Sequence, residues 1–484
     1  MKSSSILAFV VSTLVMIVGL WFFMPAEGLA VGPATIRFAS LEQDLAEAGE
    51  TKVDVDAVLA EAQQRLEIIS SSRRDSVKYF KTFINESPER FYFPGDDYHF
   101  FDDIFRSFES ARRVGKTYRI MHYGDSQIEM DRISLVLRDS LQAHFGGTGV
   151  GLIPAVQRVP TYSTNQSWSG SMTRYIVFGD STTVRAPHKG YGLMAQFSRV
   201  TGSATISVRP TRNKSASERV KSFSRISMLV GNTSGDFKVS IKCDTLKPIV
   251  RNTEVAAGSV DMLTWDLPHN VSNATISMTG SADVYGIMLD GKGGVAVDNE
   301  ALRGCSGTIF TRVSKESMSG AYARNDTRLI ILQFGGNMVP SISSAKNISS
   351  YLDNLNKQFD YFREVAPKAK ILFIGPSDMS SMQGGRMKTR PHLVALNDSL
   401  RVNAVRNGVA YWDMFSAMGG ENSMAQWVSH KPAYAGPDYI HFTPLGAEHM
   451  GGILSKAFLN CYDFYRLRKE VGDDQIKKIW RESN

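Results

Sequence analysis

Four short apolar runs, separated or followed by segments with helical periodicity, dominate the hydrophobic pattern of the chain. The runs are YRIMHY at 118–123, LIILQF at 329–334, ILFIG at 371–375 and VAYWDM at 409–414. Apolar residues recur at helical spacing over 97–112, 130–144, 347–364, 392–406 and 446–470. This alternation of strands and helices predicts a parallel β-sheet that is covered by helices on both faces.

The residues that directly follow each predicted strand carry the candidate chemistry. In an open parallel sheet, ligands bind outside the carboxyl ends of the strands. The polar and glycine-containing segments found there are Gly124-Asp125-Ser126, Gly335-Gly336-Asn337 and Gly375-Pro376-Ser377-Asp378.

Between about 155 and 290 the apolar residues no longer recur at helical spacing but alternate with polar residues. In DFKVSIKCD, Phe237, Val239 and Ile241 share one face, and ATISVRP at 204–210 alternates in the same way. Frequent turn residues separate these runs, which predicts a β-sandwich inserted into the α/β body. Its aromatic residues form either hydrophobic core, which we expect for most of them, or a sugar-stacking platform. They include Trp168, Tyr175, Tyr191 and Trp265.

The first 30 residues contain an uncharged apolar stretch, ILAFVVSTLVMIVGLWFFM, at 6–24. As a helix it would extend about 28 Å, close to the hydrocarbon thickness of a bilayer. We favour a membrane anchor. The small residues at 28–30 are a possible cleavage site, so a cleavable signal peptide is the alternative. Because Lys2 precedes the stretch, the rest of the chain is expected outside the cytoplasm.

Residues 31–90 have the pattern of a tether with one amphipathic helix. Val55, Val58, Leu59, Leu66 and Ile69 recur at helical spacing, and SSSRR at 70–74 breaks that pattern. Residues 91–154 and 291–484 then form the two parts of the α/β domain, on either side of the insertion.

Composition limits the classes of partner and cofactor. The 484 residues carry a net charge of +7, with 43% hydrophobic and 21% charged residues, which is ordinary for a globular protein with two domains. The basic residues are spread along the chain, so nucleic acid is not an expected partner. Cys243, Cys305 and Cys461 lie far apart, a pattern that predicts neither a metal cluster nor a disulfide framework.

Ser126 is either the N-cap of a helix or a nucleophile. A nucleophilic serine needs a base, a group that orients the base, and fixed donors for the oxyanion. In GPDYIHFTP at 436–444, Asp438 can orient His441, and the following Thr443-Pro444 suits the start of a helix. The Asn337 amide and the Gly304 N–H are candidate donors to an oxyanion.

These stretches, in this order, resemble the SGNH hydrolase superfamily, also called GDSL-type esterases. The matching segments are Gly124-Asp125-Ser126, Gly304, Gly335-x-Asn337 and Asp438-x-x-His441, within residues 95–155 and 285–465. The resemblance implies a flavodoxin-like three-layer α/β/α fold, with Ser126 as nucleophile, His441 as general base and Asp438 as its orienting acid. It also implies an oxyanion hole formed by the N–H groups of Ser126 and Gly304 and the side chain of Asn337.

The chain departs from the family pattern at a few positions. Gln127 stands where the family motif has a leucine, and Met338 stands where many members have an acidic residue. We expect both changes to leave the site intact. Arg303-Gly304-Cys305 replaces a more usual Asn-Gly pair, which makes Gly304 the least typical site residue. A second Gly-Asp-Ser at 179–181 lacks the strand-to-helix context, so Ser126 is preferred.

The inserted β-sandwich refines the resemblance. An SGNH domain interrupted after its first block is similar to the peptidoglycan O-acetylesterases of bacterial envelopes, whose inserted domain resembles carbohydrate-binding modules. It implies an exported serine esterase that removes O-acetyl groups from a cell-envelope or extracellular glycan through an acetyl-enzyme. Such a protein would be anchored in the inner membrane facing the periplasm, or be periplasmic if the N-terminal segment is cleaved. The chemistry requires no metal or organic cofactor.

Two other functions remain open. A polysaccharide O-acetyltransferase would use the same triad and pass the acetyl group to a sugar hydroxyl. The other alternative is a catalytically inactive glycan-binding protein, which has no chemical need for Ser126, Asp438, His441 and Asn337 together.

Overall fold

The computed structural model describes Ser12 and residues 29–31, 34–36, 72–179, 182–244 and 246–482. They fall into two compact units, Met1–Ser76 and Val77–Asn484. In the first unit, β1 (Leu29–Val31) pairs with β2 (Ala34–Ile36) in an antiparallel hairpin. Apart from Ser12, the expected membrane or signal segment lies outside the described residues, as does the amphipathic pattern at 55–69. Within the described ranges, none of the helices is both long and apolar enough to cross a membrane.

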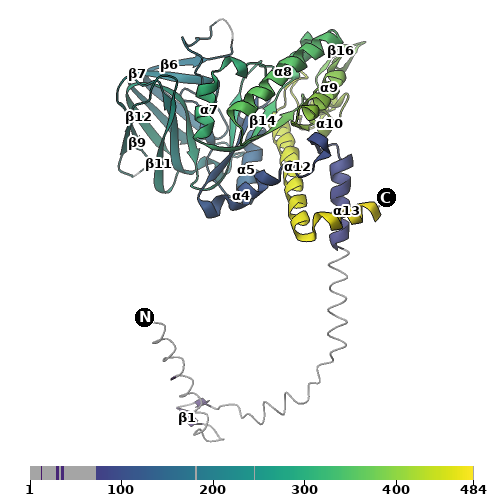
Figure 1. Cartoon of the computed structure of the whole chain (residues 1–484), viewed down its shortest axis with the longest axis horizontal. Coiled ribbons are helices and arrows are strands. Elements are labelled where there is room, and N and C mark those ends of the chain that lie inside the picture. Colours follow the sequence, from purple (N-terminus) through teal and green to yellow (C-terminus); the bar gives the residue numbers. More distant parts are fainter. Residues whose placement is uncertain are drawn as a thin grey trace. The chain divides into compact units, whose positions relative to one another are not determined.

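A six-stranded sheet forms the centre of the second unit (Figure 1). Its strand order is β13 (Gly294–Ala301), β4 (Thr117–Gly124), β14 (Asp326–Gln333), β15 (Lys370–Ile374), β18 (Ala410–Trp412) and β3 (Phe91–Tyr92). The first five strands are parallel, and β3 joins the edge in antiparallel orientation. Numbered along the chain, the parallel strands have the order 2-1-3-4-5 of a flavodoxin-like sheet. The predicted α/β fold is therefore confirmed.

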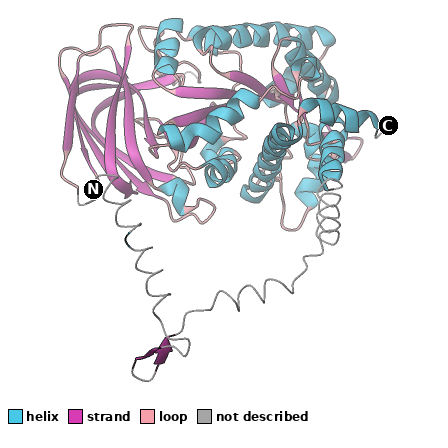
Figure 2. Cartoon of the chain, turned by 60° about the horizontal axis from the view of Figure 1, so that its bottom comes forward, coloured by secondary structure: helices cyan, strands magenta, loops and turns pink. Residues whose placement is uncertain are grey.

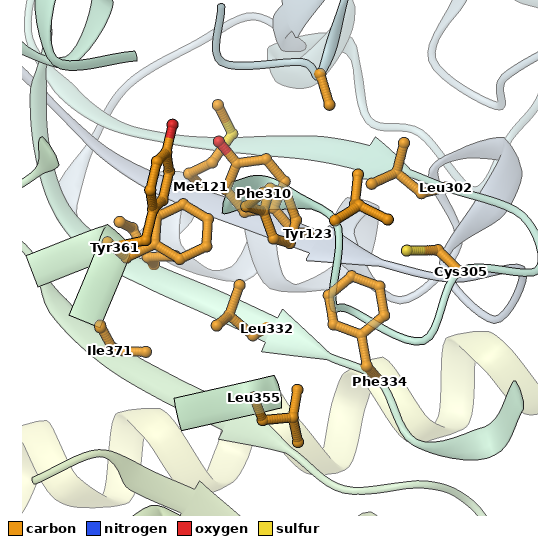
Figure 3. Packing of buried hydrophobic residues seen from close by; sticks show 14 of the residues in the cluster. Met121, Tyr123, Leu302, Cys305, Phe310, Leu332, Phe334, Leu355, Tyr361 and Ile371 are labelled. Carbon is orange, nitrogen blue, oxygen red and sulfur yellow. The ribbon is translucent and has the colours of Figure 1, made fainter. Parts of the chain in front are cut away.

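Helices cover both faces of this sheet because alternate strand residues point to opposite sides. On one face, Met121 and Tyr123 of β4 pack in a core with α7 (Lys315–Ala323), α8 (Ala345–Val365) and α9 (Leu393–Arg406). Figure 3 shows Tyr123 in this core close to Phe310. On the other face, Ile120 packs with α4 (Asp102–Val114), α5 (Ser134–Phe145) and α12 (Pro444–Val471). The predicted helices at 97–112, 347–364, 392–406 and 446–470 are confirmed as α4, α8, α9 and α12.

The remaining elements of this domain are short. They are the 3-10 helices η1 (Pro94–Asp96), η2 (Glu129–Asp131), η3 (Phe310–Arg312) and η4 (Gly336–Ser341), the helices α10 (Met414–Ala417), α11 (Ser423–Ser429) and α13 (Asp473–Glu482), and the hairpin of β16 (Ser380–Gln383) and β17 (Arg386–Thr389).

The tether prediction is wrong for its last part. Residues 72–86 form one helix, so the segment at 72–74 does not break helical structure as predicted. Val77 and Phe80 of this helix are buried against Phe464 of α12 and Ile476 of α13. Burial of this apolar face stabilises the helix in a way that a local pattern of serine and arginine does not reveal.

An extra domain of eight antiparallel strands lies between α5 and β13 in the sequence (Figure 2). Its strands are β5 (Gly151–Ile153), β6 (Thr164–Ile176), β7 (Gln196–Pro210), β8 (Phe223–Gly231), β9 (Phe237–Lys242), β10 (Ile249–Thr253), β11 (Val260–Val271) and β12 (Ala274–Asp290), with the short helix α6 (Glu218–Lys221) between β7 and β8. They form one hydrogen-bonded network instead of the two separate sheets of a sandwich. The reason is the long strand β12, which pairs with β9 along its first half and with β8 and β5 along its second half.

The aromatic residues of this domain divide between core and surface. Trp265 and Tyr191 are buried, as expected for core residues. Trp168 on β6 is 40% exposed, and Tyr175 is half-buried and stacks on Phe197 with ring centroids 5.1 Å apart. The four aromatic residues considered for a sugar-stacking platform therefore do not share one exposed face.

A buried ionic cluster connects the extra domain to the parallel sheet. Arg119 on β4 donates two hydrogen bonds to Asp298 on β13, of 2.9 and 2.6 Å, and two to Asp290 at the end of β12, of 2.7 and 3.4 Å. The Leu152 N–H on β5 also donates to Asp298, at 2.7 Å. Strand β13 was not predicted from the sequence, because its second half is acidic and becomes a buried strand only through partners such as Arg119.

We expect Arg119→Leu to lower the free energy of unfolding by about 3–5 kcal/mol, because it leaves two buried carboxylates without their cation. Urea unfolding monitored by circular dichroism measures this change. The matched control is Arg225→Leu, which removes the exposed pair between Arg225 and Asp266 and should cost less than about 1 kcal/mol. Equal losses in the two variants would contradict the structural role of the cluster.

A second polar contact at this junction involves Glu300, the buried penultimate residue of β13. Its Oε1 accepts a hydrogen bond of 3.1 Å from Gln196 Nε2 on β7. Burial raises the pKa of Glu300 to about 8, from an ordinary value of 4.5. The folded protein therefore holds a proton that the unfolded chain releases at lower pH.

This raised pKa predicts a stability that depends on pH. The contribution of protonated Glu300 is complete below about pH 4.5 and is lost as the pH rises toward about 8. Its slope is at most about 1.4 kcal/mol per pH unit. Urea unfolding across this window should show a smaller slope in Glu300→Gln, whereas Glu218→Gln, at a side chain that is 90% exposed, should keep the parent slope. An unchanged slope in Glu300→Gln would contradict the prediction.

Candidate active site

Ser126 lies in a tight turn after the carboxyl end of β4. Gly124 makes this turn possible, because a Cβ at that position would lie 2.8 Å from Ile128 Cδ1. The next regular helix, α5, begins only at Ser134, and Ile133 occupies its N-cap position. Ser126 therefore does not cap the helix that follows it, and the predicted start of that helix at 130 is wrong. The backbone of Met130, Asp131 and Ile133 has positive φ angles, which excludes a continuous helix there.

A chain of hydrogen bonds connects Ser126, His441 and Asp438. The distance between Ser126 Oγ and His441 Nε2 is 2.8 Å. The other ring nitrogen, Nδ1, lies 2.7 Å from Asp438 Oδ2. The structure thus brings together a hydroxyl, an imidazole and a carboxylate in the order that activates a serine nucleophile.

The loop that carries Asp438 and His441 is held by its own backbone and by the helix after it. Asp438 Oδ1 accepts the N–H groups of Ile440 and His441 at 3.0 and 3.1 Å. Burial opposes ionisation of Asp438, but its hydrogen bonds from the His441 side chain and from these N–H groups outweigh that effect and lower its pKa. Thr443 caps α12 by accepting the Gly446 N–H at 3.1 Å, so the predicted cap is confirmed.

Two side chains join this loop to the Ser126 turn. Gln127 Nε2 donates to the Ile440 carbonyl at 2.7 Å, and Gln127 Oε1 accepts the Phe442 N–H at 3.3 Å. Arg132 donates to the carbonyls of Phe442 and Ser126, at 2.9 and 2.6 Å. The departure at Gln127, which we expected to be neutral, thus adds contacts that a leucine cannot make. Gln127 and Arg132 are positioning residues that sequence reasoning missed, although Gln127 was visible as an unusual residue beside the serine.

Asn337 and Gly304 lie beside Ser126, as the sequence predicted, but Asn337 is already occupied. Asn337 Nδ2 donates to Asp125 Oδ2 and to the Cys305 carbonyl, both at 3.0 Å. Both hydrogens of its amide are therefore engaged with protein acceptors. Gly304 has a φ of +77°, which favours glycine. Within the described residues, no protein acceptor is hydrogen-bonded to the backbone N–H of Ser126 or of Gly304.

Three other reactive side chains near the site are buried. Burial raises the pKa of Asp125 to about 6, and its carboxylate accepts hydrogen bonds from the Gln127 N–H and Asn337. Burial lowers the pKa of His122 to about 4, and its ring is held between Gln333 and Ser134. Burial raises the pKa of the Cys305 thiol to about 11, so it stays protonated near neutral pH. None of the three competes with Ser126 and His441 as nucleophile and base.

A cleft of about 300 Å³ opens above these residues. Its lining includes Ser126, His441, Gly304 and Asn337, together with apolar residues from the strand ends: Phe334, Pro340, Met379 and Met414. Arg303 also lines the cleft and forms an ion pair with Glu129. The side chain of Ser377, which follows β15, lines the cleft and accepts a hydrogen bond from Gln127 Nε2 at 3.2 Å.

Several other candidates from the sequence do not contribute to this site. Asp180 and Ser181 of the second Gly-Asp-Ser lie outside the described residues. Cys243, Cys305 and Cys461 are free thiols. Across the described ranges, the His, Cys, Asp and Glu side chains form no group of three or more that could hold a metal ion.

Comparison with known proteins agrees with the fold. Residues 273–449 match the model of the GDSL-like Lipase/Acylhydrolase family. This match assigns an ester-hydrolase domain of the GDSL type to these residues. A solved structure of a peptidoglycan O-acetylesterase aligns with a TM-score of 0.60 and 18% identity, over 76% of this chain and 96% of the other.

More distant structures include a family two carbohydrate esterase from Cellvibrio japonicus. It aligns with a TM-score of 0.24 and 12% identity, over 62% of this chain and 98% of the other. A comparison with curated proteins found no match. The likeness to the O-acetylesterase structure extends over 76% of this chain and supports the fold of that part.

We expect Gln127→Leu to lower kcat for p-nitrophenyl acetate by about ten- to a hundredfold, because the His441 loop loses its contacts to the Ser126 turn. KM should stay within about twofold of the parent value, since Gln127 is not expected to hold the ester. Steady-state kinetics and a thermal unfolding curve separate this effect from loss of folding. Gln426→Leu, at an exposed position of α11, is the control. An unchanged kcat in folded Gln127→Leu would contradict the positioning role.

Proposed function

We propose that the protein is an exported serine esterase that removes O-acetyl groups from a cell-envelope or extracellular glycan. The observation that carries this proposal is the hydrogen-bonded chain from Ser126 through His441 to Asp438, at a cleft of about 300 Å³. A cleft of this size is at the lower end of the range for small-molecule sites, which suits one acetylated sugar unit. The likeness to the peptidoglycan O-acetylesterase structure supports the choice of an acetylated glycan.

In the proposed first step, Ser126 Oγ attacks the carbonyl carbon of the acetyl ester while His441 Nε2 takes the hydroxyl proton. The imidazolium is stabilised by Asp438, whose lowered pKa keeps it ionised. His441 then gives the proton to the departing sugar oxygen, which leaves an acetyl group on Ser126. In the second step, His441 takes a proton from water as the water oxygen attacks the acetyl carbon. The bond from that carbon to Ser126 Oγ then breaks, His441 returns the proton to Oγ, and acetate leaves.

The oxyanion of each tetrahedral intermediate is assigned to the N–H groups of Ser126 and Gly304 and to the Asn337 amide. The two N–H groups have no protein acceptor among the described residues and both residues line the cleft. The Asn337 amide joins them when the oxyanion replaces one of its present acceptors, the Cys305 carbonyl. Donors of this kind are typically worth about 3–4 kcal/mol of barrier each.

The proposed location is the bacterial cell envelope. The apolar stretch at 6–24, preceded by Lys2, supports either an inner-membrane anchor facing the periplasm or a cleaved signal. In the first case the N-terminal segment contacts the membrane, and in both cases the esterase domain meets glycan outside the cytoplasm.

Acetate release tests the proposal. With p-nitrophenyl acetate, acetylated xylan and O-acetylated peptidoglycan as substrates, we expect the full-length protein to release acetate and Ser126→Ala to lose at least about a thousandfold of that rate. Ser169→Ala, at an exposed position of β6, is the matched control. Release that survives in Ser126→Ala would contradict the triad.

The same assay separates hydrolysis from acetyl transfer. A soluble oligosaccharide acceptor is added, and free acetate and acetylated acceptor are measured by mass spectrometry. Acetate as the main product supports the esterase, whereas acetylated acceptor as the main product would assign the triad to transfer. Glycan binding without either product, unchanged in Ser126→Ala, would indicate a binding protein.

A further inference from the structure

A second, smaller pocket lies at the same end of the parallel sheet as Ser126. Glu300 and Ala301, at the carboxyl end of β13, form part of it, and β6 and β7 of the extra domain supply another wall. Its volume is about 110 Å³, and its polar lining includes Glu129, Gln157, Arg158, Arg174, Gln196 and Glu300. The ion pair of Glu129 with Arg303 joins this lining to that of the active-site cleft, so the two cavities are neighbours.

The pocket has a surplus of positive charge. Its acids Glu129 and Asp131 are already paired with Arg303 and Arg138. Within the described part of the chain, neither Arg158 nor Arg174 forms an ion pair, and the Arg174 Nε donates instead to the neutral Gln196 Oε1 at 2.6 Å. Burial lowers the pKa of Arg174; Glu300 acts in the opposite direction, and the nearby Arg158 adds to the lowering. A half-buried guanidinium without an anion is unfavourable, and a bound anion would relieve that cost.

Glu300 does not supply that anion. Its buried carboxyl group has a pKa of about 8 and is therefore mainly protonated at neutral pH. Gln196 separates it from Arg174 and donates to its Oε1 at 3.1 Å. A protonated carboxyl group is a hydrogen-bond donor, so two arginines and a neutral acid line the same small space. Gln157 Oε1 adds a buried acceptor that has no partner among the described residues.

We propose that this pocket is a subsite for a carboxylate of the substrate, borne next to the acetylated sugar, with Arg174 and Arg158 as its cationic partners. This inference rests on the proposed esterase function, because it assigns the pocket to the same substrate. A planar carboxylate suits the fork of a guanidinium, and a small carboxylate group suits the limited volume. The unpaired Gln157 acceptor suits a hydroxyl donor on the same sugar.

The test compares acidic with neutral acetylated substrates. The substrates are O-acetylated oligogalacturonate, O-acetylated peptidoglycan and O-acetylated xylo-oligosaccharide, and the variants are Arg174→Gln and Arg158→Gln in the full-length protein. We expect KM for at least one acidic substrate to rise about tenfold or more with kcat unchanged, because a charge-assisted hydrogen bond is lost. The neutral substrate and p-nitrophenyl acetate should keep their parent kinetics.

Arg209→Gln, at an exposed position of β7 away from the pocket, controls for a general loss of positive charge. An effect confined to oligogalacturonate assigns the carboxylate to an acidic sugar, and one confined to peptidoglycan assigns it to the lactyl or peptide group. Equal effects on acidic and neutral substrates, or no effect on either acidic one, would overturn the subsite.

A binding measurement separates this inference from the proposed function. Unacetylated oligogalacturonate and a muramyl peptide are titrated by calorimetry into Ser126→Ala and into the double variants Ser126→Ala with Arg174→Gln and Ser126→Ala with Arg209→Gln. A Kd about tenfold weaker only with Arg174→Gln supports the subsite even where no acetate is released. Undetectable binding of both carboxylates, or equal Kd values in the three proteins, would overturn it while leaving acetate release to decide the esterase.

Discussion

The parallel register of β13, β4, β14 and β15 is the constraint on which the site depends. Gly124 at the end of β4 is aligned with Ala301 on β13 and with Gln333 on β14, and Gln333 is aligned with Ile374 on β15. The segments that follow these strands therefore emerge at one level of the sheet. This alignment is what brings Ser126, Gly304 and Asn337 to one cleft, although almost 180 residues separate the first two.

The base reaches this level by a different route. His441 lies in an irregular loop before α12, and no strand of the described sheet places it opposite Ser126. The loop is instead fixed by the cap of Thr443 on α12 and by hydrogen bonds from Gln127 and Arg132. The residues around the nucleophile thus have two roles in this protein, since the turn that exposes Ser126 also holds the loop of its base.

The extra β domain is attached at the β13 edge of the sheet, where charge is unevenly distributed. Arg119 forms ion pairs with both Asp290 and Asp298, and this cluster holds the domain in place. One level higher, toward the carboxyl ends, Arg174 and Arg158 lack such partners among the described residues, and Glu300 is mainly protonated. The same interface is therefore held together by the ion pairs of Arg119. Beside the active site it presents arginines that can bind a ligand, and an elongated substrate would extend there from the cleft.

Local patterns determined most of the architecture. The apolar runs and helical periods placed four of the five parallel strands and the main helices, because a strand or helix that buries one or both faces must repeat its apolar residues at a fixed period. The ordered segments around Ser126, Asn337 and His441 also identified residues that the fold brings together. Strand β13 has no such apolar repeat along its whole length, because its acidic half is buried only through Arg119 and Gln196.

Tertiary structure decided the features that depend on partners distant in sequence. The helix at 72–86 forms where a tether was predicted, because Val77 and Phe80 meet apolar residues of α12 and α13. The role of Gln127 depends on the His441 loop, which lies more than 300 residues away. The occupied amide of Asn337, and the absence of an ion-pair partner for Arg174 among the described residues, are likewise properties of the folded surroundings. Sequence periodicity reports which residues are buried, but hydrogen bonding and charge balance depend on which groups the fold brings within reach.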